Sequence, residues 1–242
     1  CHIIPGLSAF VGGDITAGIL ASGMLEQEAS TLLIDLGTNG EMALGNRHRL
    51  HACATAAGPA FEGGANRGIW GADMVRLLQK LLEEGLMDGQ GLLKEPYFTK
   101  GVRIGDVLVT KESVRAVQLA KGAIAAGIEI LADSYGIRFS DISKVVLAGG
   151  FGYYLDPKAA VAIGLLPEEL ADCTVTGGNT ALSGAAMVGS RILTAGGKQT
   201  AEGTLPDGGD DLRKRQELQI RILNLAEEEK FPETFLTKIN FN

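Results

Sequence analysis

Short runs of mostly apolar residues alternate with longer helical patterns along this chain. Apolar runs bounded by glycine or polar turns are typical of buried strands, and apolar positions three and four residues apart predict helices. The predicted strands are 32–36, 41–44, 48–54, 107–109, 144–148, 173–176 and, as an edge strand, 218–225. The predicted helices are 14–21, 70–85, 110–135, 158–163, 181–193 and 231–241. This order predicts an α/β fold, with a mixed β-sheet and flanking helices.

The first long apolar run ends in a tight polar turn that leads directly into the next strand. Asp35 lies at the end of the strand, and the turn then carries the hydroxyl of Thr38 and the amide of Asn39. Gly37 and Gly40 permit positive φ and leave backbone N–H groups uncovered, and a concave row of such groups binds anions. The turn is therefore a candidate site for nucleotide phosphates. Asn-Gly is also a strong hairpin turn in its own right, so an ordinary hairpin explains these residues equally well.

A second strand, residues 144–148, runs into the sequence Gly-Gly-Phe-Gly at 149–152. This is not a dinucleotide fingerprint, because the third glycine is missing from the required spacing, and the chain has no Walker-type phosphate loop. Gly149 and Gly150 would let a flat ring or a sugar rest on the backbone. Close packing of the next helix on the strand is a comparable explanation.

Three polar residues outside these two corners are open to two interpretations. Asp14 stands where the N-cap of the helix 14–21 is expected, and a cap is the preferred interpretation. Lys121, on the longest helix, is interpreted as a solvated lysine, with a nucleotide-facing lysine as the alternative. Glu62 is the one carboxylate of the glycine-rich stretch 55–68, which is either a surface loop or part of a ligand cleft.

Two of the predicted helices, 14–21 and 181–193, consist largely of small residues. Such helices can approach each other until their backbones are in contact. We therefore expect them to cross closely and to act as a hinge.

Composition and charge exclude several functional classes. The 242 residues are 45% hydrophobic and 21% charged, which is typical of one large globular domain or two small ones. A net charge of −7 with one short basic run argues against nucleic-acid binding. No signal peptide or membrane-spanning run is visible.

The cysteines and histidines do not form a recognisable metal or disulfide pattern. Three widely spaced cysteines favour reduced thiols and a cytoplasmic location. His48 and His51 would face opposite sides of their strand, so they could not readily chelate one ion. The chain begins at Cys1 rather than at a methionine, and we interpret it as part of a longer protein.

Four motifs, taken in order, resemble the reductive activators of corrinoid proteins. These proteins belong to the superfamily of acetate and sugar kinases, heat-shock cognate proteins and actin. The motifs are LIDLGTNGE at 33–41, TAAGPAFEG at 55–63, QLAKGAI at 118–124 and LAGGFG at 147–152, and the similarity covers nearly the whole chain. The resemblance implies a ribonuclease H-like half of an actin-like ATPase, with a glycine-rich irregular insertion. It also implies that ATP and Mg²⁺ drive electron transfer from an N-terminal [2Fe–2S] ferredoxin-like domain to an inactivated corrinoid protein.

The same resemblance assigns roles to individual residues. Asp35 is implied as the catalytic carboxylate and as the Mg²⁺-facing group, directly or through water. The implied nucleotide-binding residues are Gly37, Thr38, Asn39, Gly40, Gly149 and Gly150. Further candidates for the cleft are Asp14, Glu41 and Glu62.

In this comparison the chain matches only the C-terminal part of the family. Residues 1–25 would be a connecting segment, 26–195 the ATPase core, and 196–242 a loop with a closing segment. The ferredoxin domain and the first phosphate motif lie outside the sequence, so the fragment alone is expected to be inactive. The implied partners are a nucleotide and a corrinoid protein, and a homodimer is left open.

Residues 68–73 differ from the relatives, where a small cysteine stands in place of Trp70 and the preceding insertion is longer. This difference favours a second hypothesis, in which the fold serves as a non-catalytic scaffold, docking or dimerisation module. A sugar- or acid-kinase activity ranks below both, because no carboxylate can be assigned to the phosphoryl acceptor.

Overall fold

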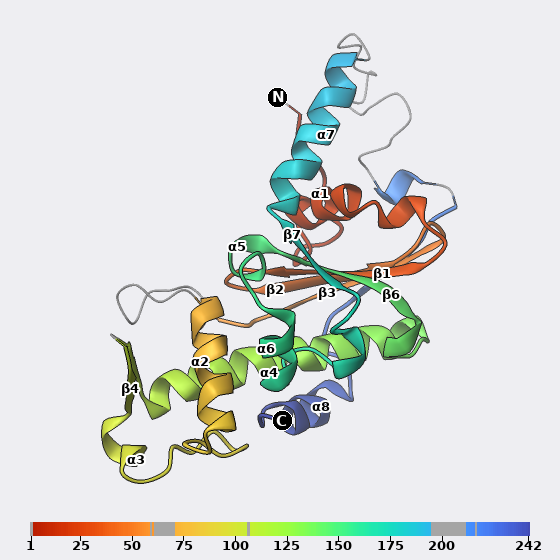
Figure 1. Ribbon diagram of the computed structural model, residues 1–242. Helices are drawn as coiled ribbons and strands as arrows, with labels where there is room; N and C mark the ends of the chain where they lie inside the picture. Colours follow the sequence, from red (N-terminus) through yellow and green to blue (C-terminus); the bar gives the residue numbers. More distant parts are fainter. Residues whose placement is uncertain (1, 59, 61–70, 106, 195–211, 216) are drawn as a thin grey trace.

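The computed structural model describes all residues except 1, 59, 61–70, 106, 195–211 and 216. Within the described residues the main sheet has six strands, and helices lie on both of its faces (Figure 1). Its strands are β1 Ser30–Leu36, β2 Gly40–Gly45, β3 Arg49–Thr55, β6 Ile142–Ala148, β7 Thr174–Gly178 and β8 Gln219–Leu223. The α-helices are α1 Gly13–Ser22, α2 Gly71–Glu83, α3 Tyr97–Lys100, α4 Lys111–Tyr135, α5 Gly149–Gly152, α6 Pro157–Ala162, α7 Thr180–Thr194 and α8 Phe231–Lys238.

Shorter elements complete the described part of the chain. The strands β4 Val102–Ile104 and β5 Val107–Val109 form a separate antiparallel pair beside α2 and α3. The 3₁₀ helices are η1 Met24–Glu26, η3 Phe139–Asp141, η4 Glu168–Leu170 and η5 Leu212–Lys214.

The strand order of the main sheet is β7-β6-β1-β2-β3-β8. β2 is antiparallel to both of its neighbours, while β6, β7 and β8 are parallel to the strands they pair with. All strands except β2 therefore run in one direction and end at the same side of the sheet, which we call the carboxyl edge. The predicted mixed sheet is confirmed, and the predicted strand at 218–225 forms the edge strand β8.

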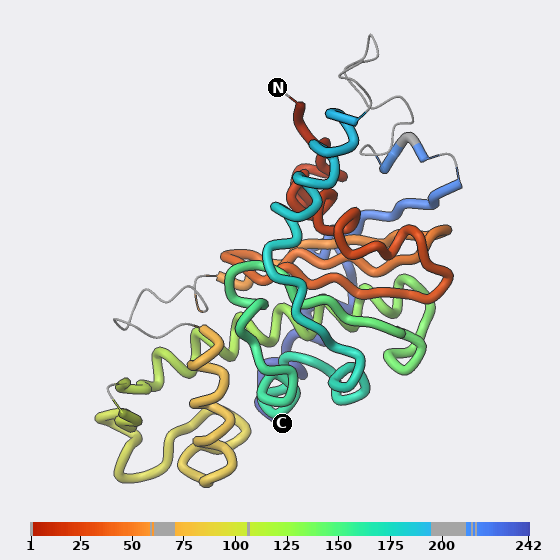
Figure 2. The backbone as a smooth tube through the Cα atoms, turned by 45° about the horizontal axis from the view of Figure 1, so that its top comes forward, coloured from red at the N-terminus to blue at the C-terminus, as the bar shows by residue number. Residues whose placement is uncertain are grey.

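Alternating residues of β1 separate two apolar layers. Leu32 and Ile34 belong to the cluster that contains the apolar residues of α4, whereas Leu33 belongs to the cluster that contains those of α1. The helices α1 and α7 lie on one face of the sheet, and α2, α4, α6 and α8 lie on the other (Figures 1 and 2). Because side chains alternate along a strand, Asp35 lies on the α1 face, as Leu33 does.

The two small-residue helices cross with their backbones in contact, as predicted. A Cβ atom placed on Gly184 of α7 would lie 2.0 Å from the carbonyl oxygen of Ala17 on α1. A Cβ atom on Gly18 of α1 would lie 3.0 Å from Oγ1 of Thr180, at the start of α7. The close crossing is confirmed, and the hinge function remains a prediction.

The structure corrects the interpretation of Asp14. The helix α1 begins at Gly13, and its N-cap is Gly12, whose extended backbone (φ −80°, ψ −177°) occupies the cap position without a side-chain hydrogen bond. Asp14 lies inside the first turn, and its Oδ1 accepts a hydrogen bond from the N–H of Ile15 at 2.8 Å. A carboxylate in this turn interacts favourably with the helix dipole, although the residue is not the cap.

The interpretation of Lys121 as a solvated lysine was wrong. The residue is 1% exposed, and its Nζ donates a hydrogen bond to the carbonyl oxygen of Asn240. Burial, and secondarily the charge of Lys238, lowers the pKa of Lys121 to about 8. Lys121 therefore joins α4 to the segment after α8. No residue of α8 is itself buried.

Candidate functional site

The carboxyl edge of the sheet brings together the ends of five strands around the turn between β1 and β2. These strands end at Leu36, Thr55, Ala148, Gly178 and Leu223. In open α/β sheets, ligands bind outside the carboxyl ends of the parallel strands. The edge is therefore the place to look for a functional site, and both glycine corners predicted from the sequence lie on it.

The turn itself differs from the predicted anion nest. Neither Gly37 nor Gly40 has a positive φ. The N–H of Gly37 donates to the carbonyl oxygen of Asn39 at 3.0 Å. A Cβ atom on Gly40 would lie 3.1 Å from the side chain of Ile124, so this glycine allows α4 to approach β2 closely. The glycines therefore shape the hairpin and its packing rather than forming a row of left-handed residues.

Three carboxylates converge on the α1 face of this turn. Asp35 and Glu41 are direct partners in the pairing of β1 with β2. Burial, and then the charge of Asp14, raises the pKa of Asp35 to about 6. Burial, followed by Asp14 and Asp35, raises the pKa of Glu41 to about 7, although Asn39 and the backbone hydrogen-bond its carboxylate. The carboxylates repel one another, so a cation at this position would be stabilised.

The raised pKa values predict a pH-dependent stability. Both groups hold their proton to a higher pH in the folded chain than in the unfolded chain, so folding stability decreases as the pH rises from about 4 to about 7. We expect Glu41→Gln to gain on the order of 1 kcal/mol relative to wild type between pH 4 and pH 8 in urea denaturation. This value is smaller than the free energy that corresponds to the whole pKa shift, because solvent screens the charge of a half-buried carboxyl group.

The exposed Glu169 on η4 offers a matched control for this comparison. Glu169→Gln makes the same chemical change away from the carboxylate cluster. A difference between Glu41→Gln and wild type that stays constant from pH 4 to pH 8 would contradict the assigned repulsion.

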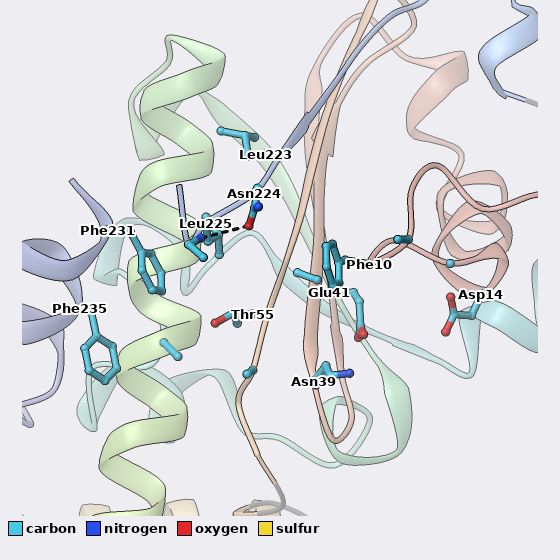
Figure 3. Close-up of a pocket in the computed structure, with 16 residues that line it drawn as sticks. Phe10, Asp14, Asn39, Glu41, Thr55, Leu223, Asn224, Leu225, Phe231 and Phe235 are labelled. Atoms are coloured by element: carbon cyan, nitrogen blue, oxygen red, sulfur yellow. Dashed lines mark hydrogen bonds between the residues drawn. The ribbon is translucent and has the colours of Figure 1, made fainter. Parts of the chain in front are cut away.

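A pocket of about 740 Å³ lies between this acidic group and the helices α4 and α8. Asp14, Asn39 and Glu41 line one side, and Leu225, Phe231 and Phe235 line the other (Figure 3). The rings of Phe231 and Phe235 are stacked, with centroids 6.3 Å apart. The pocket is thus polar and acidic at the hairpin and apolar at α8, and its volume is within the usual range for small-molecule sites.

The second glycine corner lies directly beside the hairpin, on the other side from the pocket. Asp35 pairs with Ala148, the last residue of β6. Gly149 has φ +84°, and a Cβ atom on it would lie 2.4 Å from Oδ1 of Asp35 and 2.5 Å from the carbonyl oxygen of Leu36. A Cβ atom on Gly150 would meet no described atom within 4 Å. Gly149 is therefore required for close packing, while Gly150 leaves open space at the edge.

The candidate residues thus fall into three groups. Asp14, Asn39 and Glu41 line the pocket, and Asp35 lies between the pocket and the second corner. The remaining described candidates lie in or next to the turn but do not line the pocket; they are Gly37, Thr38, Gly40, Gly149 and Gly150. Glu62 and Trp70 lie outside the described residues. Phe231 and Phe235 on α8 were not among the candidates; the signal that could have found them is their spacing of four residues within the predicted helix 231–241, which places them on one helix face.

The described residues offer few side chains that could together bind a metal ion. Among them, no group of three or more His, Cys, Asp and Glu side chains could hold a metal ion. His51 is buried, and its Nδ1 lies 3.2 Å from Oγ of Ser134. The exposed His48 has its Nε2 3.0 Å from Oε2 of Glu28. Mg²⁺ usually takes only one or two carboxylates and completes its shell with phosphate oxygens and water. Asp35 and Glu41, which are direct partners in the pairing of β1 with β2, could supply those one or two carboxylates if a phosphate supplied further ligands.

The described cysteines do not fit an iron–sulfur cluster. Cys53 is fully buried, and burial raises the pKa of its thiol to about 12. Cys173 lies at the opposite end of the sheet, before β7. In the part of the chain that the structure covers, no helix has the length and hydropathy needed to cross a bilayer.

Comparison with known proteins identifies the fold and the family. The family described as the C-terminal domain of RACo, the ASKHA domain, matches residues 29–67 and 65–195. The corrinoid activation enzyme RamQ of Eubacterium limosum is 35% identical over 222 aligned positions, and the match covers 68% of this chain and 37% of the relative. The Co(II) methylated amine-specific corrinoid protein reductase of Methanosarcina barkeri is 27% identical over 235 residues, covering 76% of this chain and 43% of that protein.

A solved structure agrees with these matches. The reductive activator for corrinoid, iron-sulfur protein superposes with a TM-score of 0.81 at 26% identity, and the match covers 98% of this chain and 44% of that one. The chain therefore spans less than half the length of these relatives. The fold expected from the four motifs is confirmed. The chain belongs to the family of C-terminal ASKHA domains of RACo.

Proposed function

We propose that the chain is the nucleotide-binding C-terminal part of an iron–sulfur protein that couples ATP hydrolysis to reductive reactivation of a corrinoid protein. The relatives named above are a corrinoid activation enzyme, a corrinoid protein reductase and a reductive activator, which supports a corrinoid protein as the partner. The coupling to ATP, the [2Fe–2S] cluster in the part that precedes this chain, the cytoplasmic location and a homodimer are further parts of the proposal.

One observation carries the nucleotide assignment. The corner at Gly149 and the turn after Asp35 are in contact at the carboxyl edge, although 114 residues separate them in the sequence. A hairpin turn alone, or a glycine corner alone, is explained by packing. Their contact at the edge where α/β sheets bind ligands is what a single split nucleotide site requires.

Within this proposal the polar turn and the acidic group have separate roles. Thr38 and Asn39 hold phosphate oxygens, and Asp35 orients the Mg²⁺ ion, directly or through a water molecule. The ion offsets the repulsion between the phosphates and the carboxylates Asp14, Asp35 and Glu41. When bound, Mg²⁺ supplies charge neutralisation for phosphoryl transfer to water.

Nucleotide turnover would act on the corrinoid partner through conformation. The bound nucleotide must have different affinities for open and closed arrangements, since otherwise it shifts no equilibrium. The crossing of α1 and α7 is the proposed hinge, because the backbone contact of Gly184 with Ala17 joins the two helices tightly.

Calorimetry of the full-length protein with Mg–ATP tests the assignment. We expect Asp35→Asn to weaken Mg–ATP binding or turnover by about 10- to 100-fold, the usual effect of removing a group that orients a metal ion. The matched control is Asp172→Asn, which changes an exposed aspartate before β7, at the opposite end of the sheet. Equal affinity and equal turnover for wild type and Asp35→Asn would refute the role of Asp35. Absence of Mg–ATP binding by the wild type would favour the alternative of a non-catalytic scaffold.

A further inference from the structure

Two neighbouring tyrosines beyond the second glycine corner are exposed to solvent. Tyr153 is 50% exposed and Tyr154 is 59% exposed. Their rings meet edge to face, with centroids 4.8 Å apart and planes at 80°. Tyrosine presents a large rigid face at a small cost in conformational entropy, and for this reason it is favoured at binding sites. Only 5% of the chain is aromatic, so an exposed aromatic pair at the ligand-binding edge requires an explanation.

The ring of Tyr153 lies on the carboxyl edge itself. The backbone N–H of Tyr153 donates to the carbonyl oxygen of Gly149 at 3.2 Å, which places Tyr153 one helical turn beyond the corner. A Cβ atom on Gly178, the last residue of β7, would lie 3.7 Å from Cδ2 of Tyr153. Because β6 separates β7 from β1, the ring is about two strand spacings, or about 10 Å, from the hairpin turn.

The space beside this ring is open. Gly149 is packed against Asp35, but a Cβ atom on Gly150 would meet nothing within 4 Å among the described atoms. The corner therefore has one glycine that faces the hairpin and one that faces free space, with the Tyr153 ring a helical turn away. A planar ligand lying over Gly150 would have backbone on one side and could lie with its other side against the exposed ring of Tyr153.

We propose that Tyr153 is the base-stacking residue of the nucleotide site and that a planar purine ring lies against its face above Gly150. This inference rests on the proposed nucleotide function and deepens it. It assigns the base to the β6–β7 side of the hairpin, with the phosphates at the turn after Asp35. The Phe231–Phe235 side of the large pocket then lies on the opposite side of the hairpin from the base.

The test compares Mg–ATP with inorganic magnesium tripolyphosphate in the full-length protein, by calorimetry. Tyr153→Ala is expected to weaken Mg–ATP binding by about 5- to 100-fold, the range for loss of base–aromatic stacking, and to leave tripolyphosphate binding within about 2-fold. Tyr153→Phe keeps the ring and is expected to bind both ligands as the wild type does. Phe98→Ala, which removes an exposed aromatic ring from α3, is the matched control.

The possible failures of the two proposals are distinguishable. Wild-type binding of Mg–ATP together with unchanged affinity in Tyr153→Ala would overturn the stacking role alone and would leave the tyrosines as a contact for a protein partner. An equal loss of ATP and tripolyphosphate binding, in a variant with an unchanged melting temperature, would likewise overturn it. If the wild type binds neither ligand, the nucleotide function fails, and the stacking role fails with it.

Discussion

Replacing Gly184 with alanine is expected to lower the free energy of unfolding by about 3 kcal/mol or more. The added Cβ atom would lie 2.0 Å from the carbonyl oxygen of Ala17, so the helices α1 and α7 must move apart. Overpacking in a tight contact usually costs about 1–3 kcal/mol, and a backbone atom cannot rotate away as a side chain can. Urea denaturation followed by circular dichroism measures the change.

Gly189, one and a half turns further along α7, provides the opposite result as a control. A Cβ atom there would meet no described atom within 4 Å. Alanine is favoured over glycine inside a helix, so Gly189→Ala is expected to stabilise the chain by about 0.5–1 kcal/mol. If both substitutions changed stability equally, the close crossing of α1 and α7 would not be the cause.

Replacing Gly149 with alanine is expected to have the second large effect, a loss of about 2–4 kcal/mol. Two causes combine at this residue. Its φ of +84° is strained for any residue with a Cβ atom, and that atom would lie 2.4 Å from Oδ1 of Asp35. Because Asp35 would be displaced, we also expect Mg–ATP binding by the full-length protein to weaken.

The neighbouring glycine is the matched control, because neither cause applies to it. Gly150 has no positive φ, and its Cβ position is open to the described surroundings, so Gly150→Ala is expected to change stability by less than about 0.5 kcal/mol. Denaturation curves of the two variants under the same conditions make the comparison. Similar losses for both would show that the corner tolerates a side chain at neither position.

Local sequence patterns were sufficient to predict most of the elements. The longest helix was predicted between Thr110 and Gly136, and the structure has a side-chain cap at Thr110 and a left-handed C-cap at Gly136. The order of strands and turns also predicted a mixed sheet. These features depend on residues that are neighbours in the chain, which explains why the sequence reveals them.

The contacts of the site depend on residues that are far apart in sequence, and they were predicted less well. The pairing of Asp35 with Glu41 follows from a short turn, but the approach of Asp14 depends on how α1 crosses the sheet. Lys121 was misinterpreted because the carbonyl group that it binds belongs to Asn240, 119 residues further along the chain. The glycines of the turn were assigned to positive φ, whereas Gly40 is needed to let Ile124 approach.

The bond between Lys121 and Asn240 has a consequence for the pocket. Phe231 and Phe235 form its aromatic wall, yet the helix that carries them, α8, has no buried residue of its own. That wall is attached to α4 by the bond from Lys121 to the segment after the helix, and by the ion pairs of Lys238 with Glu129 and of Lys230 with Asp133. The shape available to a ligand is consequently determined in part by a lysine that does not line the pocket, and a mutational map restricted to the lining residues would miss it.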